Sequence, residues 1–162
     1  MKKIIRSVLL ILVSVLGGII VGGTAIFKAM QKEKEQWKNM SNKHLKLMLL
    51  FNQWLITKQE KKSIIEYFHK NNIENIAIYG MSYIGERLFD ELKDSDIKVK
   101  YAIDKNADNI YADIDVVLPS EKMPVVDAII VTPVYYFYEI YEMLSSKVNY
   151  KIISLEDLLY EI

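Results

Sequence analysis

The chain contains no cysteine and only two histidines among its 162 residues. The absence of cysteine excludes disulfide bonds, thiolate zinc sites and thiol nucleophiles. The histidines, His44 and His69, are far apart in the sequence and lie among lysines, so we expect no histidine-based metal site. A chain of this length can hold one ordinary domain and an anchor, but not two full domains.

Negative charge is scarce in the first half of the chain, and positive charge is scarce in the second half. Residues 1–72 hold thirteen Lys and Arg against four Glu, whereas residues 73–162 hold eight Lys and Arg against seventeen Asp and Glu. Binding to nucleic acid requires a basic face, so the acidic half argues against it. The basic half suits a position beside anionic membrane lipids.

Residues 4–27 are almost free of charge, since Arg6 is the only ionised side chain among them. About 20 apolar residues in a helix cross a hydrocarbon core of about 30 Å. We therefore expect a single-pass anchor in residues 1–28 that contacts membrane lipid through residues 4–27. A cleaved signal peptide is the alternative. The lysines that follow the anchor predict that the rest of the chain is cytoplasmic.

Small residues recur at every fourth position of this apolar segment, at Ser14, Gly18 and Gly22. In lipid, such a face lets two helices approach closely enough for van der Waals packing. The pattern predicts a weak parallel homodimer. The alternative is that glycine is simply common in transmembrane helices.

Residues 29–72 form a basic connector with helical patterning. Its apolar residues at helical spacing predict either a dimerisation helix or a helix packed on its own domain; they are Leu47, Leu50, Phe51, Trp54 and Leu55. Thr57 and Glu60 have the spacing of a capping box, which predicts a new helix from about Lys58. That helix should end at Asn71-Asn72. It should bury three residues, namely Ile64, Ile65 and Phe68.

Short apolar runs alternate with helical patterns over residues 73–162, which is typical of a doubly wound parallel α/β sheet. Right-handed crossovers favour the strand order 3-2-1-4-5. The expected strands are 75–79, 98–103, 116–118, 128–131 and 151–153. Helices are expected at 84–93 and 135–146, with a short final helix capped by Ser154.

The first expected strand runs into Gly80-Met-Ser-Tyr-Ile-Gly85, which precedes a helix. In G-x-G-x-x-G loops at this position, glycines make a tight turn and let a phosphate approach free N–H groups at the helix start. Gly80 and Gly85 match the first and third glycines, while Ser82 occupies the second position. The loop, including Tyr83, is a candidate cofactor-binding segment.

Asp104 ends the second expected strand, about twenty residues after the loop, where a carboxylate accepts ribose hydroxyls and repels the 2′-phosphate of NADP. A solvated aspartate at a turn is the alternative. Thr132 follows the fourth strand and should face the Gly80 loop. It could contact the ligand or, with Pro133, simply start a helix. The tyrosines at 135, 136, 138 and 141 could stack on a base, or pack against the sheet or a partner.

Four segments, 76–85, 101–106, 127–133 and 153–157, resemble the NAD(P)-binding Rossmann-like domains of bacterial surface-polysaccharide clusters, of the nucleoside-diphosphate-sugar epimerase-like type. The resemblance covers about residues 73–162. It implies a nucleotide site at Gly80, Ser82, Gly85 and Asp104, with NAD or a nucleotide sugar as the ligand. It also implies a role in polysaccharide biosynthesis.

Catalysis by this chain alone is not indicated by the sequence. An epimerase of this type needs a Y-x-x-x-K pair on a helix, and the only match, Tyr101 with Lys105, falls on an expected strand. No substrate domain follows. Three functions remain open: a tethered nucleotide-binding module, a ligand-free scaffold that recruits an enzyme such as a glycosyltransferase, or an enzyme completed by dimerisation.

Overall fold

The computed structural model describes residues 2–162, with side chains described for residues 6, 7, 18 and 22–162. The chain divides into two units, Met1–His44 and Leu45–Ile162. The helices are α1 (Lys2–Gln59), α2 (Ile64–Lys70), α3 (Tyr83–Leu92), η1 (Ala107–Asn109), η2 (Val134–Tyr136), α4 (Phe137–Ser145) and α5 (Leu155–Glu161). The strands are β1 (Asn75–Tyr79), β2 (Lys98–Ile103), β3 (Val116–Val117), β4 (Ala128–Val131) and β5 (Lys151–Ser154).

Helix α1 continues to Gln59 without a break, so the prediction of a new helix from about Lys58 is wrong. Thr57 lies inside α1, and its hydroxyl donates to the Gln53 carbonyl at 3.0 Å. The next helix, α2, begins after Ser63, whose Oγ accepts from the N–H of Ile65 at 3.1 Å. Continuing α1 keeps Thr57 on the same buried face as Trp54, which a break before Thr57 would disrupt. The predicted end of this helix at Asn71 is confirmed.

Among the described residues, no helix is both long enough and apolar enough to cross a membrane. The predicted membrane segment, residues 4–27, falls mostly on side chains outside that description, as does the side chain of Ser14. A Cβ atom added to Gly18 or Gly22 would meet no described atom within 4 Å. The homodimer through these three residues stays a prediction.

The sheet has five strands in the order β3-β2-β1-β4-β5, as the sequence predicts. Its strand pairs are all parallel. The expected bounds of β1, β2 and β4 are confirmed, while β3 is one residue shorter. The link from β2 to β3 carries only the three-residue helix η1, so little helical cover lies over that edge.

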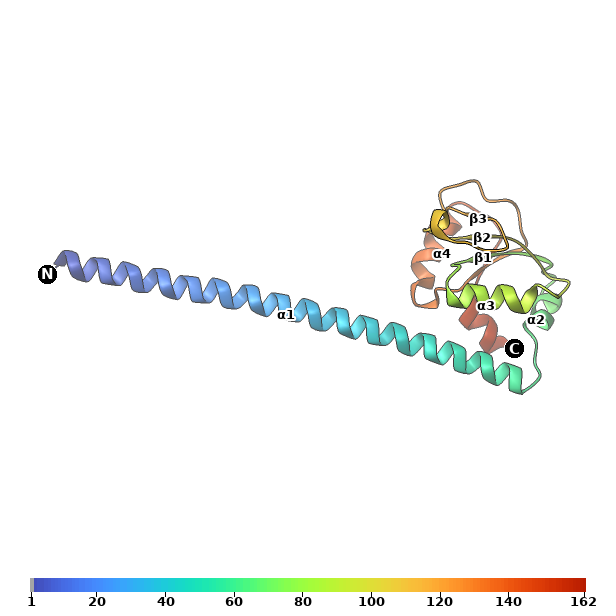
Figure 1. Cartoon of the computed structure of the whole chain (residues 1–162), viewed down its shortest axis with the longest axis horizontal. Helices are drawn as coiled ribbons and strands as arrows, with labels where there is room; N and C mark the ends of the chain where they lie inside the picture. The colour runs from blue at the N-terminus through green and yellow to red at the C-terminus, as the bar shows by residue number, and fades with distance from the viewer. Residues whose placement is uncertain (1) are drawn as a thin grey trace. The chain divides into compact units, whose positions relative to one another are not determined.

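Helices cover the two faces of the sheet unequally (Figure 1). Alternate residues of β1 point to opposite faces, so Ile76 and Ile78 join one core while Ala77 and Tyr79 join the other. The first core also contains residues of α1, α2, α3 and α5, namely Leu50, Phe68, Leu88 and Leu158. The second contains residues of α4, namely Ile140 and Leu144. The end of the predicted connector therefore belongs to the folded α/β unit.

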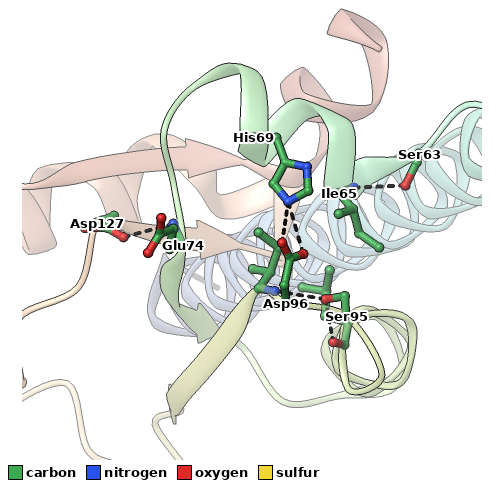
Figure 2. A network of polar contacts seen from close by, with 9 residues as sticks. Ser63, Ile65, His69, Glu74, Ser95, Asp96 and Asp127 are labelled. Carbon is green, nitrogen blue, oxygen red and sulfur yellow. Dashed lines mark hydrogen bonds and ion pairs between the residues drawn. The ribbon is translucent and has the colours of Figure 1, made fainter.

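Polar contacts connect the segments that lie just before the amino-terminal ends of the strands (Figure 2). His69 of α2 contacts both carboxylate oxygens of Asp96, at 3.0 and 2.9 Å, just before β2. Asp127, just before β4, accepts from the backbone N–H groups of Glu74 at 3.0 Å and Asn75 at 2.8 Å. The contact between Asp127 and Asn75 joins the starts of the neighbouring strands β4 and β1.

These two backbone donors lower the pKa of Asp127 below its usual value, with Asn75 contributing most. Because the folded pKa is below the unfolded one, the ionised carboxylate stabilises the fold above about pH 4 and loses this effect as the pH falls further. We expect Asp127→Ala to flatten the dependence of the unfolding midpoint on pH between about pH 5 and pH 3. Urea unfolding across this range measures it. The exposed Asp113→Ala is the control, and a slope for Asp127→Ala equal to that of the native chain would contradict the assignment.

Candidate functional site

The candidate site lies at the carboxyl ends of β1, β2 and β4. Strands β1 and β4 are neighbours, yet the chain leaves β1 toward α3 on one face and β4 toward α4 on the other. A crevice forms at such a switch point, because the two connections diverge there. The Gly80 loop, Asp104 and Thr132 are brought together at this edge.

Gly80 makes the tight turn that the sequence predicts. Its φ of +93° is a conformation that residues with a side chain rarely adopt. An added Cβ would lie 2.7 Å from the Cγ of Pro133 and 2.8 Å from the Oγ1 of Thr132. The loop can therefore pass close to the end of β4 only with glycine at this position.

Gly85 lets helix α3 pack directly on the loop. A Cβ added there would lie 2.1 Å from the carbonyl oxygen of Gly80. Ser82 is the extended N-cap of α3, and among the described residues its side chain makes no capping hydrogen bond. Tyr83 begins the helix with its side chain 83% exposed. The loop thus turns a helix N-terminus toward the edge of the sheet, but the ring of Tyr83 points into solvent.

Asp104 closes the loop from the end of β2. One carboxylate oxygen accepts from the backbone N–H of Met81 at 3.0 Å, and the other accepts from Asn106 at 2.9 Å. A carboxylate has about four acceptor positions, so ligand hydroxyls can still bind to the remaining ones. Asp104 therefore holds the loop in place through Met81 and retains acceptor capacity.

Thr132 faces the Gly80 loop, as expected, but it does not start a helix. Its hydroxyl donates to the carbonyl of Gly80 at 2.7 Å, with the carbonyl of Tyr79 at 3.1 Å, and only 1% of the residue is exposed. Pro133 caps the short helix η2, and α4 begins only at Phe137. The N-cap interpretation of Thr132 is therefore wrong, because the hydroxyl is held by the loop carbonyls.

A pocket of about 300 Å³ opens beside the loop, between the ends of β1 and β2 and helix α4. Its lining includes Gly80, Asp104, Pro133, Tyr136, Ile140 and Met143. A larger hollow of about 520 Å³ runs along β5 and, apart from Tyr141, contains none of the residues considered for ligand contact. We regard the smaller pocket as the candidate site because it lies at the switch point and contains an unsatisfied polar group.

That group is the hydroxyl of Tyr79, the last residue of β1. Tyr79 is 3% exposed and lines the pocket, and its oxygen has no hydrogen-bond partner among the described residues. Burial, with a smaller effect of the Asp104 charge, raises the pKa of Tyr79. The hydroxyl therefore stays protonated at neutral pH and can donate. Leaving a buried donor unpaired costs about 1–3 kcal/mol, so a ligand that accepts from it would recover this free energy.

Comparisons with family models, curated proteins and solved structures give no match to this chain. The chemistry of the site must therefore be argued from its own groups.

Those groups are suited to binding a polar ligand. Tyr101 and Lys105 have Y-x-x-x-K spacing, but Tyr101 lies on β2 and its hydroxyl donates to the carbonyl of Pro124 at 2.8 Å. Within the described residues, no three potential metal ligands cluster together. The pocket offers a phenolic donor from Tyr79, carboxylate acceptors from Asp104 and Glu139, and apolar walls from Ile140 and Met143.

Sequence reasoning missed Tyr79, and only Gly80 and Asp104 of the six predicted cofactor-binding residues line the pocket. The other four, Ser82, Tyr83, Gly85 and Thr132, belong to the loop or to the end of β4 but do not line it. The signal for Tyr79 was present in the sequence. It is the last strand residue before Gly80, and strand alternation places its side chain on the opposite face of the sheet from that of Ile78. Its lack of a partner is visible only in three dimensions.

Proposed function

We propose that this chain is a membrane-tethered module that binds the nucleoside part of a nucleotide or nucleotide sugar at the pocket beside Gly80. The observation that carries the proposal is the buried hydroxyl of Tyr79, which has no partner in the described part of the chain and lines a pocket that also contains the Asp104 carboxylate. Together these groups offer a donor for a base or ribose oxygen and an acceptor for ribose hydroxyls.

The size of the pocket supports a nucleoside rather than a whole dinucleotide. Ligand pockets in proteins occupy about 300–1,000 Å³, and this one has about 300 Å³. The phosphates would then lie outside it, near the N-terminus of α3, where helix N–H groups favour negative charge. Asp104 disfavours a 2′-phosphate, so we expect NAD or a uridine nucleotide to bind better than NADP.

The membrane tether in this proposal is residues 4–27, with the α/β unit in the cytoplasm. Its support is the sequence alone, in which Arg6 is the only charge over this stretch. The role in surface-polysaccharide assembly is supported by the resemblance of residues 73–162 and by no other observation. Fractionation of cells under alkaline carbonate tests the tether, since an integral protein stays in the pellet.

The test of binding is calorimetry of the full chain in detergent against UDP, UDP-sugars, NAD and NADP. We expect Tyr79→Phe to weaken binding of the preferred ligand by about two- to tenfold, the worth of one neutral hydrogen bond. The same substitution should leave the ligand-free fold equally or more stable, because it removes an unpaired buried group. A loss of affinity without a loss of stability is the specific signature of this role.

The matched control is Tyr138→Phe, which removes a hydroxyl from a side chain that is 82% exposed and outside the pocket. Its affinity should equal that of the native chain. Absence of any heat at millimolar ligand, or equal losses for the two variants, would rule out the proposed site.

A ligand-free scaffold is the second candidate, and one observation favours it. Asp104 accepts hydrogen bonds from the backbone of Met81 in the loop and of Asn106 in its own turn, so it has a structural role that does not require a ligand. Exposed tyrosine rings of the α/β unit, such as those of Tyr83 and Tyr138, would then contact a partner enzyme, for example a glycosyltransferase. Co-purification of a stoichiometric enzyme, together with no nucleotide binding, distinguishes this function from the first.

A further inference from the structure

Helix α1 carries a repeated pattern of exposed apolar side chains. From residue 27 to residue 55, steps of three and four residues alternate without interruption, which is the a/d spacing of a coiled coil over about four heptads. Six of these positions are apolar and between 42% and 63% exposed: Phe27, Met30, Trp37, Met48, Phe51 and Leu55. We call these six the α1 seam.

Part of the α1 seam lies on the helix side that its own domain leaves uncovered. Between residues 45 and 59, the side chains that pack into the α/β unit are buried. They include Leu50 and Trp54, with exposed fractions of 0% and 6%. Met48, Phe51 and Leu55 lie on the neighbouring side of the helix and remain exposed, with the ring of Phe51 stacked on that of Trp54. Packing within the unit therefore accounts for one face of the Phe51 ring, but not for the apolar character of Met48 and Leu55.

The charges beside the seam complement those of an identical helix. With Phe27 at position a, Glu33 falls at g and Lys38 at the following e position. In a parallel, in-register pair, the g residue of one helix lies beside the next e residue of its partner, so Glu33 and Lys38 would pair twice by symmetry. Glu33 is exposed and accepts a long hydrogen bond, of 3.4 Å, from the indole of Trp37 in its own helix.

Three polar residues interrupt the apolar positions, at Lys34, Ser41 and His44. A lysine at an a position lowers the stability of a coiled coil but specifies its register and favours two strands. The interruptions thus fit a weak dimer with one defined alignment. They do not fit a stable higher oligomer.

We propose that α1 pairs with α1 of a second copy of this chain as a parallel, in-register coiled coil along the α1 seam. This inference does not rest on the proposed nucleotide binding, since none of the seam residues lines the pocket at Gly80. It also uses residues outside the small-residue pattern of Ser14, Gly18 and Gly22. The consequence is a dimer in which each α/β unit is held beside another.

The absence of cysteine allows a direct test, because an introduced thiol has no other in the chain to react with. Lys34→Cys places thiols at an a position, where parallel in-register helices bring them within disulfide distance. Lys32→Cys makes the same change at the outward f position. In an antiparallel pair, only residues at the centre of the seam would lie beside their own copies. Position 34 is not at the centre, so the two introduced thiols would then be far apart. In the full chain in detergent, mild oxidation should cross-link Lys34→Cys at least about tenfold more than Lys32→Cys.

Equal cross-linking of the two variants, or none at position 34, would overturn the proposal, even where light scattering shows a dimer. A charge exchange gives an independent test. Glu33→Lys and Lys38→Glu should each weaken dimerisation by about two- to fivefold, and the double variant should restore it. Failure of the double variant to restore the dimer would exclude the parallel alignment, because only that alignment pairs these two positions.

Discussion

The substitution Gly85→Ala should lower the free energy of unfolding of the α/β unit by about 3 kcal/mol or more, at the upper end of the cost of overpacking. The added methyl group would lie 2.1 Å from the carbonyl oxygen of Gly80, which is a backbone atom and cannot rotate away. Relief requires α3 to move off the sheet, and α3 carries the fully buried Leu88 and Leu92. The clash therefore extends to the core.

Thermal unfolding followed by near-ultraviolet circular dichroism measures this loss, and we expect the midpoint to fall by about 10 °C or more. Gly23→Ala is the matched control. Its added Cβ would meet no described atom within 4 Å, and alanine favours a helix by roughly 0.5–1 kcal/mol over glycine. A midpoint for Gly85→Ala within a few degrees of the control would show that the loop is not packed as described.

The sheet could be predicted well because its signals are local and repeated. The segments 76–79, 101–103 and 128–131 are continuous apolar runs, as expected for strands buried on both faces, whereas the first half of β2 carries two lysines. The strand order followed from the handedness of parallel crossovers, which leaves few arrangements for five strands. Ser154 was also identified correctly as the cap of the last helix, since its Oγ accepts from the N–H of Glu156.

The boundary between α1 and α2 could not be predicted because two capping signals compete there. Thr57 and Ser63 are both good N-cap residues, and Thr57 also has Glu60 at capping-box spacing. The choice depends on a distant contact. The indole N–H of Trp54 donates to Glu91 of α3 at 2.8 Å, and Lys58 contacts the same carboxylate, so α1 is held helical through this region.

The candidate site was predictable in its glycines and not in its donor. Glycines occur at these two positions of the motif because other atoms come too close for a side chain. The structure shows this at both: Gly80 lies against Thr132 and Pro133, and Gly85 against the carbonyl of Gly80. Tyr79 looks like an ordinary core residue in the sequence, because a buried tyrosine usually finds a partner. Only the arrangement of α4 over the end of β1 leaves its hydroxyl facing a pocket.

Neighbouring residues on α1 have different roles. Between residues 45 and 59, Leu50 and Trp54 complete the core of the α/β unit, whereas Met48 and Leu55 are exposed on a neighbouring side of the helix. Phe51 lies at the boundary, stacked on Trp54. A dimer through the seam would also bring two copies of the pocket to one assembly.

The second large effect should come from the α1 side of that core. Leu50→Ala should lower the free energy of unfolding of the unit by about 2–5 kcal/mol, whereas Leu49→Ala should change it by no more than about 0.5 kcal/mol. Leu50 is 0% exposed and shares a core with Phe68 and Ile76, while the adjacent Leu49 is 44% exposed. Both changes remove the same atoms from the same helix, so helix propensity cancels. Urea unfolding can follow the fluorescence of Trp54 in a Trp37→Phe background, which leaves one tryptophan in the chain. Equal midpoints for the two alanine variants would mean that α1 does not complete the core, and the folded unit would then begin after residue 59.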